Sequence, residues 1–158
     1  MKYADINFND VCAGAGINVT VYLQGCPHHC PGCHNQETWD FFGGKNFTKE
    51  TLESILVGLT ANGINRNLSI MGGEPLCPEN LFTTNWIVSA VKEKYPEVKI
   101  YIWTGYLYEE LLDNKDYMMK NILRQADVLI DGPYIESERD ITLPLRGSRN
   151  QRIIELTK

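Results

Sequence analysis

The chain has 158 residues, of which 43% are hydrophobic and 22% are charged, and its formal net charge at pH 7 is −5. This length suits a single domain over residues 1–158, and the acidic balance argues against direct binding of nucleic acid. No apolar run approaches the ~20 residues that cross a bilayer, and the N-terminus lacks the apolar core of a signal peptide. We therefore expect a cytoplasmic protein without membrane contact, in which the five cysteines stay reduced.

The first half of the chain predicts a strand, a loop, a helix and a second strand. Residues 17–25 are rich in β-formers and end at a glycine, and a cysteine-rich loop follows directly. Residues 48–63 carry apolar side chains at helical spacing, with Thr48 as the expected N-cap and Gly63 as the expected end. Residues 67–71 predict a short strand that runs into two glycines.

The second half continues the same alternation. Residues 78–94 predict a helix that begins at a proline, and residues 98–105 predict the third strand. Residues 108–125 are mostly helical in pattern, with a break expected near residues 113–114. Residues 126–132 predict the fourth strand, and the polar last 26 residues show no clear pattern.

Alternation of strands and helices predicts an α/β fold with a parallel sheet and right-handed crossovers. A complete (β/α)8 barrel takes ~250 residues. A chain of 158 residues is long enough for about half of one. We therefore expect an open, partial (β/α) barrel, with a short doubly wound sheet as the alternative. In both folds the functional site lies at the carboxyl ends of the strands, where this sequence reads QGCPHHC, MGGEP, WTGY and DGPY.

Three cysteines in a CxxxCxxC pattern follow the first predicted strand: Cys26, Cys30 and Cys33. A zinc site would need a fourth ligand, for which His28, His29 and His34 are candidates, and would make the protein a non-catalytic zinc-binding module. A 4Fe–4S cluster normally takes four thiolates, so three would leave one iron open. The two remaining cysteines, Cys12 and Cys77, are expected to be buried and unreactive, although Cys77 as a further cluster ligand stays open.

The CxxxCxxC loop after a strand resembles the radical S-adenosylmethionine superfamily. This resemblance implies that the open iron binds the amino and carboxylate groups of S-adenosylmethionine, which is then cleaved to methionine and a 5′-deoxyadenosyl radical. Many members have an aromatic residue before the third cysteine, where this chain has Gly32. We expect Gly32, Cys33 and His34 to lie beside the cofactor, with an exposed loop histidine as the alternative for His34.

The segment MGGEP ends the second predicted strand and is similar to the methionine-binding motif of the same superfamily. By this resemblance Gly72, Gly73 and Glu74 contact the amino end of the cofactor, whereas a plain turn is the alternative. Thr104 ends the third predicted strand and is expected to line the same cleft. Asp131 ends the fourth, where it either binds the ribose hydroxyls or caps a turn. Trp39 and Trp103 are expected in the core.

Four segments resemble one branch of the superfamily, the activating enzymes of anaerobic (class III) ribonucleotide reductase: CHNQETW, WTGY, DGPY and LRGSRNQR. The resemblance implies a hydrogen abstraction that places a glycyl radical on the large subunit of the reductase. It also implies an electron donor such as flavodoxin and no catalytic side chain of the protein itself. The activase of pyruvate formate-lyase is the alternative within the superfamily, and a homodimer stays open.

A basic tail closes the sequence with Arg146, Arg149 and Arg152. Either it is a solvated surface, or it docks to the reductase or covers the cofactor.

Overall fold

The computed structural model of the protein describes residues 1–156, which form one seven-stranded mixed sheet with the strand order β3-β1-β2-β4-β5-β6-β7. The strands are β1 (Lys2–Asp10), β2 (Asn18–Leu23), β3 (Lys45–Asn46), β4 (Asn67–Gly72), β5 (Ile100–Trp103), β6 (Val128–Asp131) and β7 (Arg152–Glu155). The four strands β2, β4, β5 and β6 run parallel to one another, whereas β1, β3 and β7 pair antiparallel at the two edges.

The four strands predicted from the sequence form the parallel middle of the sheet, but the expectation of a purely parallel sheet is wrong at both edges. Strand β1 was missed although its sequence carries the signal of a half-exposed strand. Ala4, Ile6 and Phe8 are half-buried, and the residues between them are exposed. Strand β7 lies in the polar tail and pairs with β6, which places residues 152–155 beside residues 128–131.

The helices are α1 (Lys49–Gly58), α2 (Pro78–Lys94), α3 (Tyr108–Asp113) and α4 (Tyr117–Gln125). Helix α2 has the predicted bounds, and the predicted break near residues 113–114 separates α3 from α4. The predicted N-cap Thr48 forms a capping box with Thr51. Helix α1 ends five residues before the predicted Gly63, because the chain leaves helical geometry at Thr60 (φ −124°, ψ 10°) and then forms a 3₁₀ turn (Ala61–Gly63).

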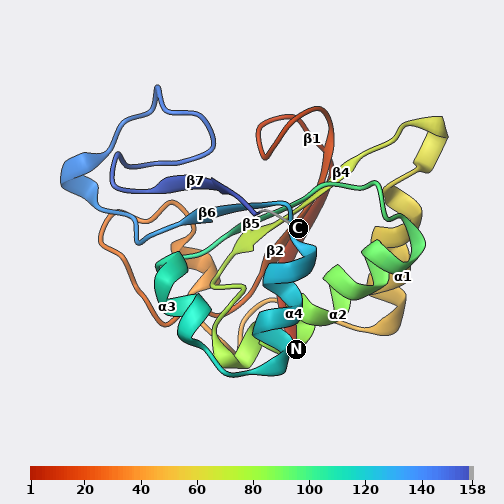
Figure 1. The fold of residues 1–158 in the computed structure, drawn as a ribbon, viewed down its shortest axis with the longest axis horizontal. Helices are drawn as coiled ribbons and strands as arrows, with labels where there is room; N and C mark the ends of the chain where they lie inside the picture. Colours follow the sequence, from red (N-terminus) through yellow and green to blue (C-terminus); the bar gives the residue numbers. More distant parts are fainter. Residues whose placement is uncertain (157–158) are drawn as a thin grey trace.

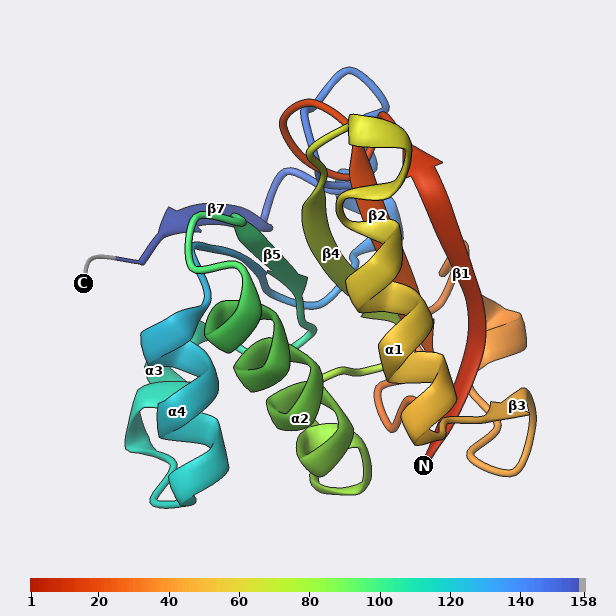
Figure 2. The ribbon, with the colours of Figure 1, turned by 90° about the vertical axis from the view of Figure 1, so that its right-hand side faces the viewer.

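Three of the helices, α1, α2 and α4, cover one face of the sheet (Figure 2). This follows from the strand order. The strands β2, β4, β5 and β6 lie side by side in the order in which they occur in the chain, so each connection steps to the next strand in the same direction. Because all these crossovers are right-handed, their helices lie on the same face of the sheet. The main core lies between the two layers. It joins apolar side chains of alternate strand positions, among them Val21, Ile70, Ile102 and Leu129, to those of the helices. A doubly wound sheet carries helices on both faces, so that alternative is not what the chain forms.

The opposite face of the sheet is covered by loops rather than helices (Figure 1). Residues 11–17 are held there by a hydrogen bond from the Ser69 hydroxyl to the Ala13 carbonyl. Residues 132–151 are held by Trp103 Nε1, which donates to the Leu145 carbonyl at 2.6 Å. A small second apolar cluster around Tyr101 and Ile130 lies beneath them. The helices described over residues 1–156 include none with the length and apolar character to span a bilayer.

Candidate active site

A cavity of about 150 Å³ lies at the carboxyl ends of β2, β4, β5 and β6. The cysteine loop (residues 24–35), the GGEP turn (residues 72–75) and the segments after β5 and β6 form its walls. The four strand ends that the sequence marked as unusual therefore meet at one place, as the fold rule for parallel strands predicts.

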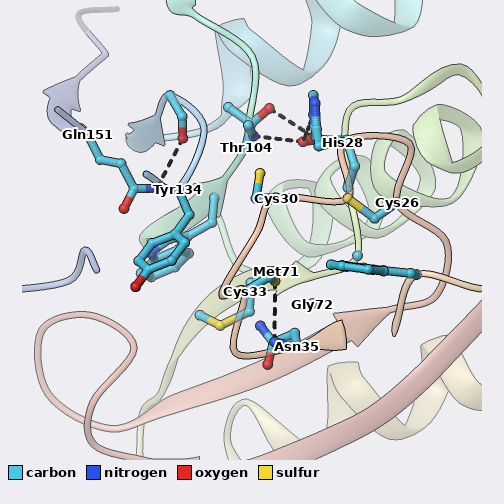
Figure 3. Close-up of a pocket in the computed structure, with 16 residues that line it drawn as sticks. Cys26, His28, Cys30, Cys33, Asn35, Met71, Gly72, Thr104, Tyr134 and Gln151 are labelled. Atoms are coloured by element: carbon cyan, nitrogen blue, oxygen red, sulfur yellow. Dashed lines mark hydrogen bonds and ion pairs between the residues drawn. The ribbon is translucent and has the colours of Figure 1, made fainter. Parts of the chain in front are cut away.

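The cysteine loop brings Cys26, Cys30 and Cys33 to this cavity, where all three are half-buried free thiols (Figure 3). The chain turns twice between these cysteines, at His29 and at Gly32, where the φ angles are positive (49° and 79°). Backbone N–H groups approach each sulfur: those of His28 and His29 at Cys26, that of Tyr134 at Cys30, and that of Asn35 at Cys33. Such N–H donors stabilise and tune thiolates bound to iron.

Burial raises the pKa of the Cys26 and Cys30 thiols, and the backbone N–H donors oppose this effect. Both sulfurs therefore hold their protons near neutral pH until a positive charge compensates for burial, as a bound metal does. Within residues 1–156 no group of three His, Cys, Asp or Glu side chains converges on a single ion position. The donor set around the cavity, three thiols with amide donors to the sulfurs, fits an iron–sulfur cluster.

Gly32 and His34 lie at the outer side of the cysteine loop. An ideal Cβ on Gly32 would stand 1.9 Å from Glu136 Oε2, and the glycine has a left-handed φ of +79°. The carboxylate of Glu136 thus occupies the space that an aromatic residue before the third cysteine would need. His34 is exposed, and its ring centroid is 6.0 Å from that of Tyr134. Neither Gly32 nor His34 lines the cavity of the three thiols.

The two glycines of the GGEP turn allow it to lie against the end of β2. A Cβ on Gly72 would be 2.8 Å from the Leu23 carbonyl oxygen, and one on Gly73 would be 2.3 Å from the Gly25 carbonyl oxygen. Both contacts are with backbone, which has little room to move. Gly73 N–H donates to the Leu23 carbonyl at 2.8 Å, and Glu74 N–H donates to the Gly25 carbonyl at 2.8 Å. Gly72, Gly73 and Glu74 all line the cavity.

The carboxylate of Glu74 is 1% exposed and accepts four hydrogen bonds. Its Oε1 accepts from the Leu76 N–H at 2.8 Å and the Thr104 hydroxyl at 2.9 Å. Its Oε2 accepts from the Gly105 N–H at 2.7 Å and from His28 Nε2 at 2.8 Å. Glu74 thus ties the ends of β4 and β5 to the cysteine loop. The sequence predicts His28 only as a candidate zinc ligand, because no local pattern indicates a hydrogen bond to a residue 46 positions away.

Asp131 is fully buried and does not line the cavity, whereas its neighbour Gly132 does. Its carboxylate accepts from the Tyr108 N–H at 2.8 Å and forms two hydrogen bonds with the guanidinium of Arg152 on β7. Arg152 also forms two hydrogen bonds with Glu109. In this arrangement a ribose hydroxyl would reach Asp131 only if Arg152 were displaced. Within the basic tail, Arg152 therefore pairs with a buried carboxylate, although its own side chain is 44% exposed.

Several cavity residues were not expected from the sequence. Trp39 lines the cavity and belongs to neither apolar cluster, so its assignment to the core is wrong. Trp103 packs against the second apolar cluster, as expected of a core residue, but it lines the cavity as well. Met71, Tyr134 and Gln151 also line it. Met71 is the penultimate residue of β4 and Trp103 is the last residue of β5. Both lie on the face opposite the helices, and the alternation of strand side chains could have indicated this. Gln151 comes from the tail, for which the sequence offered no pattern.

The two remaining cysteines differ from each other. Cys77 is buried at the start of α2, where burial raises the pKa of its thiol to about 12, and it does not line the cavity. Cys12 is exposed, which corrects the expectation that both are buried.

At pH 8 about one Cys77 thiol in 10⁴ is ionised. We therefore expect iodoacetamide to alkylate Cys12 at least tenfold faster than Cys77 in the native apo protein, as measured by peptide mass spectrometry. Equal rates would contradict the burial of Cys77.

Comparisons with known proteins agree with this site. The family model described as a 4Fe-4S single cluster domain matches residues 12–154. Three relatives bear the name anaerobic ribonucleoside-triphosphate reductase-activating protein. The Vibrio cholerae protein is 39% identical over 99% of this chain and 99% of its own length. The protein of Enterobacteria phage T4 is 37% identical over 97% of this chain and 93% of its own length. The Escherichia coli K12 protein is 34% identical, with 99% of both chains covered.

The fold and the cysteine loop thus define a single-cluster iron–sulfur domain. Within that class, the chain belongs to the family of anaerobic ribonucleoside-triphosphate reductase-activating proteins.

Proposed function

We propose that this protein is a radical S-adenosylmethionine enzyme that generates a glycyl radical on an anaerobic ribonucleotide reductase. The observation that carries the proposal is the cavity in which three thiols, and no fourth cysteine among residues 1–156, face the GGEP turn. Names and full-length similarity of the relatives support the same activity. When bound, the reduced cluster and S-adenosylmethionine supply a 5′-deoxyadenosyl radical, which takes a hydrogen atom from a glycine Cα of the reductase.

The chain's own residues bind and orient in this proposal. Cys26, Cys30 and Cys33 would hold the cluster through three of its irons, and the fourth iron would be open to S-adenosylmethionine. Gly72 and Gly73 line the cavity and would contact the amino end of the cofactor, and both must be glycine because a Cβ on either would meet the backbone of residues 22–25. Glu74 and Thr104 keep the turn and the end of β5 in place through their hydrogen bond.

Three further residues take outer positions in the proposed site. Gly32 and His34 form its rim beside Tyr134. Asp131 supports the wall residue Gly132 through its bonds with Arg152. A side chain that acts as acid, base or nucleophile is not required, because the cofactor carries the chemistry.

The arrangement of the sheet suits a large partner. Helices α1, α2 and α4 cover one face of the sheet, and loops cover the other. The parallel strands therefore fit an open, partial barrel. A loop of the reductase can approach the side of this barrel on which the cavity lies. A glycine is a suitable target because it has no side chain to block that approach. The proposal includes a flavodoxin-like electron donor, a homodimer and a cytoplasmic location, where thiols stay reduced.

The test is anaerobic. The protein is reconstituted with iron and sulfide, reduced, and mixed with S-adenosylmethionine, with and without the reductase. We expect a brown protein that forms 5′-deoxyadenosine and methionine in equal amounts, with more of both when the reductase is present. A colourless protein that retains zinc and forms neither product would contradict the proposal and favour the zinc-binding module.

A further inference from the structure

We propose that His28 is a positioning residue, which holds the segment between Cys26 and Cys30 against the GGEP turn and so sets where the cluster lies relative to S-adenosylmethionine. This inference rests on the proposed function. His28 lines the cavity, and the role assigned to it here is not that of a ligand: it acts through its hydrogen bond with Glu74.

The contacts of the His28 ring leave it one position. Its Nε2 is 2.8 Å from Glu74 Oε2, and since an ionised carboxylate only accepts hydrogen bonds, Nε2–H donates. The ring packs edge-on against Tyr106, with centroids 4.6 Å apart and planes at 69°. A Cβ on Gly105 would stand 2.6 Å from His28 Cδ2, so only glycine leaves room for the ring here.

His28 is the one link of its kind among the described residues. The backbone bonds between the GGEP turn and the cysteine loop reach Leu23 and Gly25, which precede the first ligand. The Asn80 side-chain amide likewise reaches the carbonyls of Gln24 and Gly25. Within residues 1–156, the hydrogen bond of His28 alone joins residues 26–33 to the GGEP turn or to the end of β5.

Burial makes this link effective. The His28 side chain is 19% exposed and that of Glu74 is 1% exposed, so water competes little for their bond. The other three donors to Glu74 come from Leu76, Thr104 and Gly105, which all lie outside the cysteine loop. Loss of His28 therefore leaves Glu74 anchored and the turn intact, but frees the segment that carries two cluster ligands.

The neighbouring histidine supplies a matched control. His29 stacks on Trp39, with ring centroids 4.7 Å apart and planes at 23°, and none of its side-chain contacts reaches Glu74. Its φ of 49° is one that asparagine tolerates. His29→Asn thus alters the same loop without touching the proposed link.

The experiment compares His28→Phe, His28→Gln and His29→Asn with the unmodified protein, each anaerobically reconstituted. Phenylalanine keeps a ring for Tyr106 but removes the donor, whereas glutamine keeps a donor. The readouts are iron content, the S-adenosylmethionine concentration that half-converts the EPR spectrum of the reduced cluster, and amide hydrogen exchange of residues 26–33 in the apo protein.

We expect His28→Phe to retain the iron content but to need at least tenfold more S-adenosylmethionine, and to exchange the amides of residues 26–33 faster. His28→Gln and His29→Asn should stay within about threefold of the unmodified protein. Unchanged binding and exchange in His28→Phe would overturn the inference, as would equal losses in His28→Phe and His29→Asn. Failure of the proposed function would instead appear in the unmodified protein, as absence of a cluster, while the hydrogen-exchange comparison would still test the link.

Discussion

Replacement of Cys26, Cys30 or Cys33 by alanine abolishes formation of 5′-deoxyadenosine, with a loss of at least a hundredfold for each single change. Each thiol has its own N–H donors and its own place at the cavity, so no neighbouring group substitutes for it. A cluster held by two thiolates exposes two irons and is lost or degraded. Iron and sulfide analysis, followed by a product assay, measures the effect.

Cys12→Ala is the control for this series, because Cys12 is exposed and lies outside the cavity of the three thiols. We expect full iron content and cleavage in this variant. Full activity in any one of the three cavity variants would disprove the ligand assignment. Loss of iron and of cleavage in Cys77→Ala, with an intact fold, would indicate that Cys77 is a fourth thiolate ligand. This result would contradict the proposal that one iron is open.

Arg152→Ala lowers the free energy of unfolding by about 2 kcal/mol, since hydrogen bonds to a buried charge contribute roughly 1.5–3 kcal/mol and partial exposure of the arginine reduces this. The variant leaves the buried carboxylate of Asp131 with the hydrogen bond from the Tyr108 N–H and removes the link between β7 and Glu109 of α3. Urea unfolding of the apo protein at pH 7 measures the change.

Arg149→Ala is the matched control in the same tail, because Arg149 is exposed. We expect a change within about 0.5 kcal/mol there. Equal effects of the two substitutions would show that Arg152 is an ordinary surface residue.

The pKa of Glu109 provides a second measurement of the role of Arg152. Hydrogen bonds from Arg152 lower the pKa of Glu109 to about 2. A depressed carboxyl pKa stabilises the fold above the ordinary pKa of the group, and this contribution is lost as the pH falls toward 2. In Arg152→Ala the pKa of Glu109 returns toward its ordinary value, which NMR titration of the side chain can follow.

The parts of this molecule that could be predicted from sequence are those with local signals. The helical spacing in residues 48–63 and the proline at residue 78 are such signals, and so are the runs of β-formers that became β2, β4, β5 and β6. The cysteine spacing likewise lies within eight residues. Each of these can be recognised without knowing what the segment contacts.

The parts that were missed depend on partners far apart in the chain. His28 and Glu74 are separated by 46 positions, and Asp131 and Arg152 by 21. Their charges and polar groups could be read, but the fold alone brings them together. Strand β1 is different, because its alternation of half-buried and exposed residues was present in the sequence and was overlooked.

The most direct test of the account is the transfer of deuterium. The anaerobic reductase is prepared with α-deuterated glycine and mixed under reducing conditions with the reconstituted protein and S-adenosylmethionine. The account predicts a glycyl radical in the EPR spectrum of the reductase and one deuterium atom in each 5′-deoxyadenosine formed with it. A radical without deuterium in the 5′-deoxyadenosine, or cleavage without any radical on the reductase, would contradict direct hydrogen abstraction from glycine by this protein's cofactor.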